Sequence, residues 1–322
     1  MYFPYLRGRQ NELLALIELV NNNLIGNEVI PILEPIKMNC TLVETVKAFI
    51  KRGKQIAVVL NPNVGVLNER ILSKQEDMEF SSIAQEFYIL LNNSAIIKSF
   101  ILNNHVAALL VDDEHLANYL IINTSLDSYY VYDSLFKNTK PRFTLVPHNN
   151  RFSNIVEKGK VLLKDNFIKR NDTQDYKSEC DTLFSKSIYF YKEEGFIGLS
   201  DYSIVGKDYI DTRYAPTSVA IHLTYFDGNN LRIHNFVSQS NKGIEDPAGE
   251  LREALVKMID FCEQKSVKHT KGLDELFNIY KDNKYPGLGT IKKLSIMHHI
   301  ELVSGYLEEK KAWYYWIFFP IY

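Results

Sequence analysis

Acidic residues stand directly behind an apolar run in the stretch AALLVDDEH, residues 107–115. Five apolar residues precede Asp112, Asp113 and Glu114. Carboxylates are favourable in the first turn of a helix, so the stretch is compatible with a helix start that has no chemical role. A buried strand that ends here would instead deliver the carboxylates to a site. The sequence of this stretch alone leaves both interpretations open.

The same arrangement recurs along the first two-thirds of the chain. Eight apolar runs are strand candidates, and each ends on side chains that bind metals or anions or transfer protons. These side chains are Arg7, Arg9, Glu34, Lys37, Asn61, Asn63, Asp112, Asp113, Asp133, His148, Asn149, Lys164, Asp165 and Asp201. Each one alone is also compatible with a capping or solvated role, because loops are polar. As a set they predict a polar pocket where the strands end.

The residue types suggest roles within such a pocket. Catalytic candidates are Asp112, His148, Lys164 and Asp201, with His148 the best general acid or base. Substrate-binding candidates are Arg7, Arg9, Lys37, Asn61 and Tyr202, which suit an anionic small molecule or a nucleotide. Metal-ligand candidates are Glu34, Asp112, Asp133 and Asp165, an oxygen set that suits Mg²⁺ or Mn²⁺. Metal-assisted hydrolysis of a phosphoester fits this set, while lyase or isomerase chemistry and a binding-only site stay open.

The elements that must position these residues indicate an α/β fold. The strand candidates are residues 1–8, 28–36, 55–63, 106–113, 128–135, 142–149, 159–167 and 195–205. Most are continuous apolar runs, as in parallel sheets covered on both faces, and helical patterns such as 11–23, 41–53 and 114–123 separate them. Eight such units predict a (β/α)8 TIM-barrel-like domain over residues 1–210. An open doubly wound sheet is the alternative, and short links after the fifth and sixth candidates weaken the barrel.

The pattern changes in residues 211–322, which predict an α+β C-terminal part packed on the barrel. Two strand-like segments flank Asp227-Gly228-Asn229-Asn230, a strong hairpin signal, and amphipathic helical patterns follow. His222 and His234 lie on the two hairpin arms and would face each other across a three-residue turn. They are either a candidate metal pair or ordinary strand residues.

Composition limits the class of protein. The chain has 322 residues, a formal net charge of −2 and three cysteines, so it has no bulk basic excess and disulfides are not expected. Arg7 and Arg9 precede any long apolar run, which argues against a signal peptide. No uninterrupted apolar stretch approaches the roughly 18 residues of a membrane span. We therefore expect a cytoplasmic protein.

Three stretches resemble the bacterial and phage "Beta protein" family and its close uncharacterised bacterial relatives. They are YFPYLRGRQNELLAL followed by IPILEPIK, GFIGLSDYSIV, and GLGTIKKLSIMHHIELV. Ile291 stands where the family's last segment has a tryptophan. The resemblance carries over Arg7, Glu34, Asp201, Tyr202 and the pair His298-His299 as motif positions without assigned roles.

The resemblance implies a protein of phage-defence or mobile-element neighbourhoods and no established activity. The nearer relatives resemble one half of a two-protein set, which suggests a protein partner from a two-gene system. A non-catalytic partner-binding subunit is therefore the alternative to an enzyme, and a homo-oligomer is a further alternative. The aromatic C-terminus WYYWIFFPIY is rich in interface-type residues, although it would equally close the core.

Overall fold

The computed structural model describes residues 1–67, 82–209, 218–239 and 245–318, and the side chains of these residues except 150, 153 and 312–318. The chain divides into two compact units, which are described separately. The first comprises residues 1–22, 27–164 and 190–201, and the second comprises residues 23–26, 165–189 and 202–322. Both units are therefore assembled from separate stretches of chain, whereas the sequence predicted a single division after residue 210.

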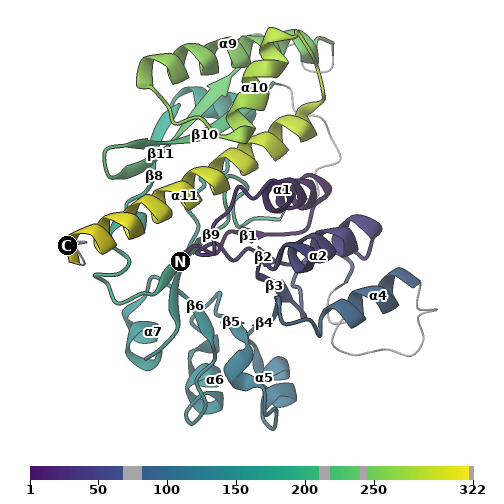
Figure 1. The fold of residues 1–322 in the computed structure, drawn as a ribbon, viewed down its shortest axis with the longest axis vertical. Coiled ribbons are helices and arrows are strands. Elements are labelled where there is room, and N and C mark those ends of the chain that lie inside the picture. The colour runs from purple at the N-terminus through teal and green to yellow at the C-terminus, as the bar shows by residue number, and fades with distance from the viewer. Residues whose placement is uncertain (68–81, 210–217, 240–244, 319–322) are drawn as a thin grey trace. The chain divides into compact units, whose positions relative to one another are not determined.

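The first unit is a nearly closed barrel of eight parallel strands (Figure 1), which confirms the predicted fold class. In sheet order the strands are β1 (Tyr5–Leu6), β2 (Ile32–Leu33), β3 (Ile56–Val59), β4 (Ile96–Ile101), β5 (Leu120–Ile122), β6 (Phe143–Pro147), β7 (Lys160–Lys164) and β9 (Gly198–Asp201). A parallel bridge pairs Tyr2 with Leu199, and the Phe3 amide donates to the Leu199 carbonyl at 2.8 Å. These contacts join the last strand to the segment before β1.

Helices follow most of the strands. They are α1 (Gln10–Asn21), α2 (Cys40–Arg52), α4 (Ser82–Leu90), α5 (Asn104–Leu110), α6 (Ser128–Leu135) and α7 (Asn150–Ile155), with a short 3₁₀ turn η1 (Leu116–Asn118). Figure 1 shows α2, α4, α5, α6 and α7 outside the ring of strands. Local sequence explains their limits: at α2, the Asn39 side chain accepts a hydrogen bond from the Leu42 amide, and Gly53 ends the helix at φ 62°.

Two of the eight predicted strands are wrong. Residues 104–110 form α5, because the Asn103 side chain caps the helix by accepting from the Val106 amide at 2.8 Å. Residues 128–135 form α6, whose Tyr132 is buried. The fourth and fifth strands are instead 96–101 and 120–122, both almost wholly buried apolar segments. The last of these lies inside the stretch predicted as the helix 114–123.

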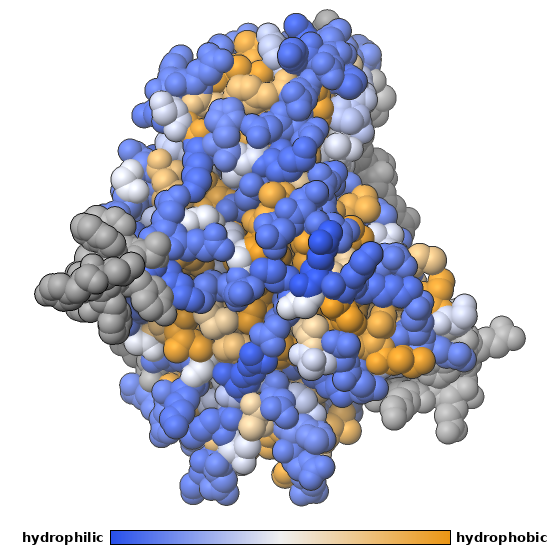
Figure 2. Space-filling view, viewed as in Figure 1, coloured by the Kyte–Doolittle hydropathy of each residue, from blue (hydrophilic) through white to orange (hydrophobic). Residues whose placement is uncertain are grey.

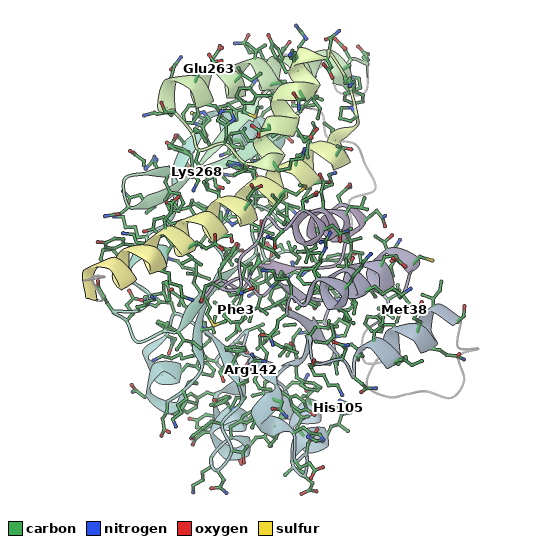
Figure 3. The ribbon with its side chains drawn as sticks, viewed as in Figure 1. Phe3, Met38, His105, Arg142, Glu263 and Lys268 are labelled. Carbon is green, nitrogen blue, oxygen red and sulfur yellow. The ribbon has the colours of Figure 1, made fainter. Side chains whose placement is uncertain are left out.

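Strand register identifies the face of the sheet that lines the barrel. The Phe3 ring lies 5.0 Å from the ring of Phe143 on β6, although the strands beside Phe3 are not neighbours of β6. Phe3, labelled in Figure 3, lies among the barrel strands. The next residue on β6, Thr144, points the other way and contacts the Tyr132 hydroxyl of α6 at 3.1 Å. Phe143 therefore faces the interior, and Thr144 faces the surrounding helices.

The second unit contains an antiparallel three-stranded sheet in the order β10-β11-β8. Its elements are the 3₁₀ turn η2 (Thr173–Lys177), β8 (Asp181–Ser185), β10 (Ala220–Asp227), β11 (Asn230–Val237), α9 (Pro247–Lys265), α10 (Lys271–Lys281) and α11 (Leu288–Phe318), and α8 (Ser187–Phe190) leads back to the barrel strand β9. The predicted hairpin is confirmed, with Asp227 paired to Asn230. Residues 181–185 form β8, which is the third strand of this sheet.

Helices α9 and α11 cover opposite faces of that sheet (Figure 1). On one face the Phe261 ring of α9 contacts the rings of Tyr225 and His234 at 5.1 and 4.2 Å. On the other face Phe226 stacks on Tyr306 of α11 at 4.4 Å. The alternation of Tyr225 and Phe226 along β10 accounts for this division. None of the described helices combines the length and apolar character needed to cross a bilayer.

Candidate functional site

Glu34 lies at the carboxyl end of β2, inside the mouth of the barrel. The pairing of β1 with β2 places Glu34 on the same face of the sheet as Tyr5. The Glu34 side chain is only 2% exposed. The Tyr5 hydroxyl donates to Glu34 Oε2 at 2.9 Å, and the Asn63 amide donates to Oε1 at 2.8 Å. Both oxygens of this buried carboxylate are thus held by groups from β1 and from the loop after β3.

Arg7 is the cation beside this carboxylate. Its Nε lies 3.4 Å from Glu34 Oε2, and its side chain is 11% exposed. The Arg7 amide donates to Glu12 Oε2 at 2.7 Å, which anchors the β1–α1 loop to the first turn of α1. Gly8 follows at φ 61°, and a Cβ there would lie 3.3 Å from the Glu34 carbonyl oxygen. The loop therefore approaches β2 closely and fixes Arg7 at the mouth.

The loop after β3 lies against the carboxyl end of β2, where Glu34 and Ile36 contact it. Asn61 is buried and continues the sheet through its side chain: Nδ2 donates to the Ile101 carbonyl at 2.7 Å, and Oδ1 accepts from the Ile101 amide at 2.9 Å. Further along, Gly65 adopts φ 82°, and the Val66 amide donates to the Ile36 carbonyl at 2.8 Å. Asn61 thus has a structural role, and the predicted substrate contact through its side chain is not supported.

Asp201 and Lys164 face away from the barrel interior. Lys164 pairs with Asp201, and Tyr2 pairs with Leu199, so Asp201, Lys164 and Tyr2 share one face of the sheet. Ser200, the neighbour of Asp201, shares the interior face with Phe143 according to the register across β6, β7 and β9. The predicted gathering of Asp201 and Lys164 with Glu34 is therefore wrong, because alternate residues of a strand point to opposite faces.

Asp201 is instead buried against the outer side of the strand ring. The Tyr2 hydroxyl donates to Asp201 Oδ1 at 2.8 Å. Burial, followed by the charge of Asp201 and this hydrogen bond, raises the pKa of Tyr2 well above its ordinary value. The pair ties the last strand to the N-terminal segment.

Asp112 and Asp133 do not lie at strand ends. Asp112 is exposed and stands after α5 and before β5, so it belongs to the end of the barrel opposite the carboxyl ends of the strands. Asp133 is exposed on α6, in the outer layer of helices. Their predicted catalytic and metal-binding roles at one centre are wrong, because the segments that carry them are helical rather than extended.

Three further candidates lie where predicted along the chain but are accessible to solvent. His148 directly follows β6 with 66% of its side chain exposed, and its Nε2 lies 3.8 Å from Glu194 Oε2. Lys37 is exposed in the β2–α2 loop, and Arg9 is the N-cap of α1. His148 and Lys37 are therefore exposed to a ligand at the rim, whereas Arg9 is half-buried at the start of α1.

Asp165 and Tyr202 belong to the second unit. Asp165 accepts hydrogen bonds from the amides of Phe167 and Lys207 at 3.3 and 3.0 Å, and Tyr202 is buried. The contact with Phe167 stabilises a local turn, and the contact with Lys207 joins that turn to a segment 42 residues further along the chain. The structure therefore gives Asp165 a structural role.

The predicted metal ligands do not form one coordination sphere. Glu34 lies at the mouth with both oxygens engaged, whereas Asp112 and Asp133 lie elsewhere on the barrel. Across the described ranges 1–67, 82–209, 218–239 and 245–318, no three His, Cys, Asp or Glu side chains form a group suited to a metal ion. The four predicted ligands therefore do not converge on one Mg²⁺ or Mn²⁺ site within the described residues.

Three of the five histidines singled out by the sequence, His222, His298 and His299, make hydrogen bonds within the second unit. His298 Nδ1 lies 2.7 Å from Thr270 Oγ1 and its Nε2 lies 2.7 Å from the Thr224 carbonyl, while His299 Nδ1 lies 3.0 Å from Thr224 Oγ1. His222 pairs with Asn235, so it does not face His234 as expected for a metal pair. The turn has two residues rather than three, which shifts the register.

Sequence reasoning missed Tyr5 and Glu12. Tyr5 stands two residues before Arg7, the spacing that places two side chains on one face of a strand, and this signal was present in the sequence. Glu12 is at the third position of α1, where a carboxylate reaches back to amides before the helix. A site built from residues 5, 7, 12, 34 and 63 therefore draws on only the first three strands.

Comparisons with protein-family models, curated proteins and solved structures found no match to this chain. The arrangement of Tyr5, Arg7 and Glu34 at the mouth of the barrel therefore carries the functional interpretation. A guanidinium beside a buried carboxylate, at the end of the barrel where catalytic loops gather, suits an anionic ligand.

Proposed function

We propose that the mouth of the barrel binds an anionic, phosphate-bearing ligand through Arg7. The observation that carries this proposal is the ion pair of Arg7 with Glu34, whose Oε2 also accepts a hydrogen bond from the Tyr5 hydroxyl. Arginine forms paired hydrogen bonds with phosphate and carboxylate groups, and a preoriented guanidinium loses less conformational freedom on binding. Glu34 is a positioning residue in this proposal, because its oxygens already accept hydrogen bonds.

Hydrolysis of a phosphoester, in a phage-defence or mobile-element system, is the reaction that we propose for this site. Exposed His148 at the rim is the available proton-transfer group among the predicted catalytic residues. Dependence on Mg²⁺ or Mn²⁺ stays a prediction, and so does membership of the "Beta protein" family. The protein's cytoplasmic location is likewise a prediction.

The test is hydrolysis of 4-nitrophenyl phosphate and bis(4-nitrophenyl) phosphate by the full chain, with Mg²⁺, with Mn²⁺ and with EDTA. Arg7→Gln is expected to lower kcat/KM by about tenfold or more, the effect of losing a charge-assisted hydrogen bond. Arg52→Gln is the matched control, because Arg52 is exposed at the end of α2. Equal rates for the two variants contradict a role for Arg7, and a wild-type rate equal to the buffer blank contradicts the hydrolase.

The alternative function, a partner-binding subunit of a two-protein complex, is supported by exposed apolar side chains on the barrel unit. Leu109, Val111, Leu126 and Tyr130 are exposed around α5 and α6, with Tyr130 at 78%. On the face shown in Figure 2, hydrophilic residues dominate and apolar residues form separate patches. Exposed apolar clusters are typical of protein-binding surfaces.

Light scattering tests self-association, and co-purification with the product of the neighbouring gene tests the partner. Tyr130→Ser is expected to abolish either association, and Tyr285→Ser, at an exposed tyrosine of the second unit, is the control. Truncation after Lys311 tests the aromatic C-terminus, whose side chains lie outside the described residues. Association that survives both Tyr130→Ser and the truncation contradicts this alternative.

A further inference from the structure

The second unit contains a cavity of about 420 Å³ between β11, the start of β8 and α9. Cavities of this size accommodate small molecules. Residues 257, 260, 261 and 264 of α9 line one side, at the spacing that places side chains on a single helix face. His234 of β11 and Lys177 of η2 line the cavity from the other elements.

His234 presents an oriented imidazole to this cavity. Its Nδ1 lies 3.0 Å from Asp181 Oδ2, and the ring stacks on Phe236 at 4.4 Å. In the neutral ring, the Nδ1 proton is donated to the carboxylate and Nε2 is left as an acceptor. Among the described residues, only Nδ1 of this side chain makes a hydrogen bond. The pairing therefore fixes both the ring orientation and the position of the acceptor.

Asp181 is itself held from two sides. The Tyr225 hydroxyl donates to Oδ2 at 2.7 Å and Arg232 Nε donates to Oδ1 at 2.7 Å. Burial acts to raise the pKa of Asp181, but the hydrogen bonds from Tyr225, His234 and Arg232 outweigh it and lower that pKa. Three donors on one face of the sheet thus maintain the carboxylate that orients His234.

Two lysines give the cavity a basic side. Lys257 Nζ donates to the Val237 carbonyl at 2.7 Å, and Lys177 Nζ donates to the Gln239 carbonyl at 3.4 Å. Each ammonium has three N–H donors, so two on each lysine remain for a ligand. Among the described residues that line the cavity, Asp260 is the one acidic side chain, so these residues together carry a net positive charge.

We propose that this cavity is a second ligand site, which binds a small organic phosphate that carries a hydroxyl group. The phosphate contacts Lys177 and Lys257, and the hydroxyl donates a hydrogen bond to His234 Nε2. The site shares no residue with the mouth of the barrel, so it does not depend on the function proposed there.

The experiment is isothermal titration calorimetry of the full chain in an Arg7→Gln background, which removes the proposed anion contact in the barrel. The probes are glycerol phosphate, inorganic phosphate and glycerol. Glycerol phosphate is expected to bind more tightly than inorganic phosphate, and glycerol is expected not to bind. Lys257→Met is expected to weaken glycerol phosphate binding by about tenfold or more. Lys265→Met on the same helix is exposed, does not line the cavity and serves as the matched control.

His234→Asn tests the imidazole separately. The asparagine amide still donates toward Asp181 but removes the Nε2 acceptor, so the affinity for glycerol phosphate is expected to fall to that for inorganic phosphate. No saturable binding of glycerol phosphate, or equal binding by Lys257→Met and Lys265→Met, overturns the site. Equal affinity of the Arg7→Gln parent for glycerol phosphate and inorganic phosphate overturns the role of His234.

Discussion

Two histidines, the buried His298 and the half-buried His222, predict that the second unit loses stability in mild acid. His298 is fully enclosed between Thr270 and the Thr224 carbonyl, and His222 Nδ1 lies 2.7 Å from Asn235 Oδ1. Burial is the largest cause that lowers the pKa of each from 6.5 to about 4. Both rings therefore stay neutral in the folded chain at pH values where exposed histidines carry a proton.

The direction and size of the effect follow from linkage. Between about pH 6.5 and 4, the unfolded chain binds protons at His222 and His298 that the folded chain does not bind. The stabilisation is complete above pH 6.5 and declines as the pH falls. At about pH 5 each histidine has cost about 2 kcal/mol of the free energy of unfolding, and the two together about 4 kcal/mol.

Urea unfolding followed by circular dichroism at several pH values between about 7 and 5 measures this loss. His298→Gln keeps a donor toward Thr224 and removes one titrating group, so its stability is expected to fall less steeply with decreasing pH. His115→Gln, at an exposed histidine, is the matched control and is expected to retain the wild-type slope. Burial raises the pKa of neighbouring Glu301, and this opposite contribution is common to wild type and variants.

The histidine ring resonances provide an independent check. Signals of His222 and His298 are expected not to titrate above about pH 5. A His298→Gln slope equal to that of wild type, or ring signals from both His222 and His298 that titrate near pH 6.5, would refute the reasoning.

Two further predictions concern the barrel. Tyr2→Phe leaves buried Asp201 without its 2.8 Å hydroxyl donor and is expected to lower the free energy of unfolding by about 1–3 kcal/mol, measured by urea unfolding. Gly65→Ala places a Cβ 2.4 Å from the Ile36 carbonyl oxygen at φ 82° and is expected to cost more than Gly53→Ala, at φ 62° with nothing within 4 Å, which is expected to cost about 1 kcal/mol. Equal losses at the two glycines would show that the loop after β3 moves away without cost.

The sequence predicted the right number of barrel strands, but two of the predicted strands are helices. Two strands that were not predicted take their place in the barrel. Residues 106–113 and 128–135 have apolar and aromatic residues suited to strands, yet Asn103 caps the first as a helix. The true strands 96–101 and 120–122 lie within stretches with helical spacing of apolar residues. Short apolar runs fit either structure, and pairing with neighbouring strands decides between them.

The candidate site was predictable where strand ends were correctly located. Arg7 and Glu34 end the first two strands, and the structure brings them to 3.4 Å. Asp201 was located on the correct strand, but a shift of one residue along a strand reverses the face, and the sequence alone does not define that register. Asp112 and Asp133 do not lie at this site, because the segments predicted as their strands form the helices α5 and α6.

The route of the chain between β7 and β9 has a consequence for dissecting the protein. After residue 164 the chain leaves the barrel, contributes β8 to the sheet of the second unit, and returns at residue 190 to form the final barrel strand. A fragment ending after Asp201 would carry β8 without β11, the strand to which it pairs. The complementary fragment would expose a long edge of β11 to other chains, and unpaired strand edges promote aggregation. A single cut in the chain therefore does not separate the two units. To express them separately, residues 165–189 must be removed from the barrel fragment and joined to the fragment that contains β11.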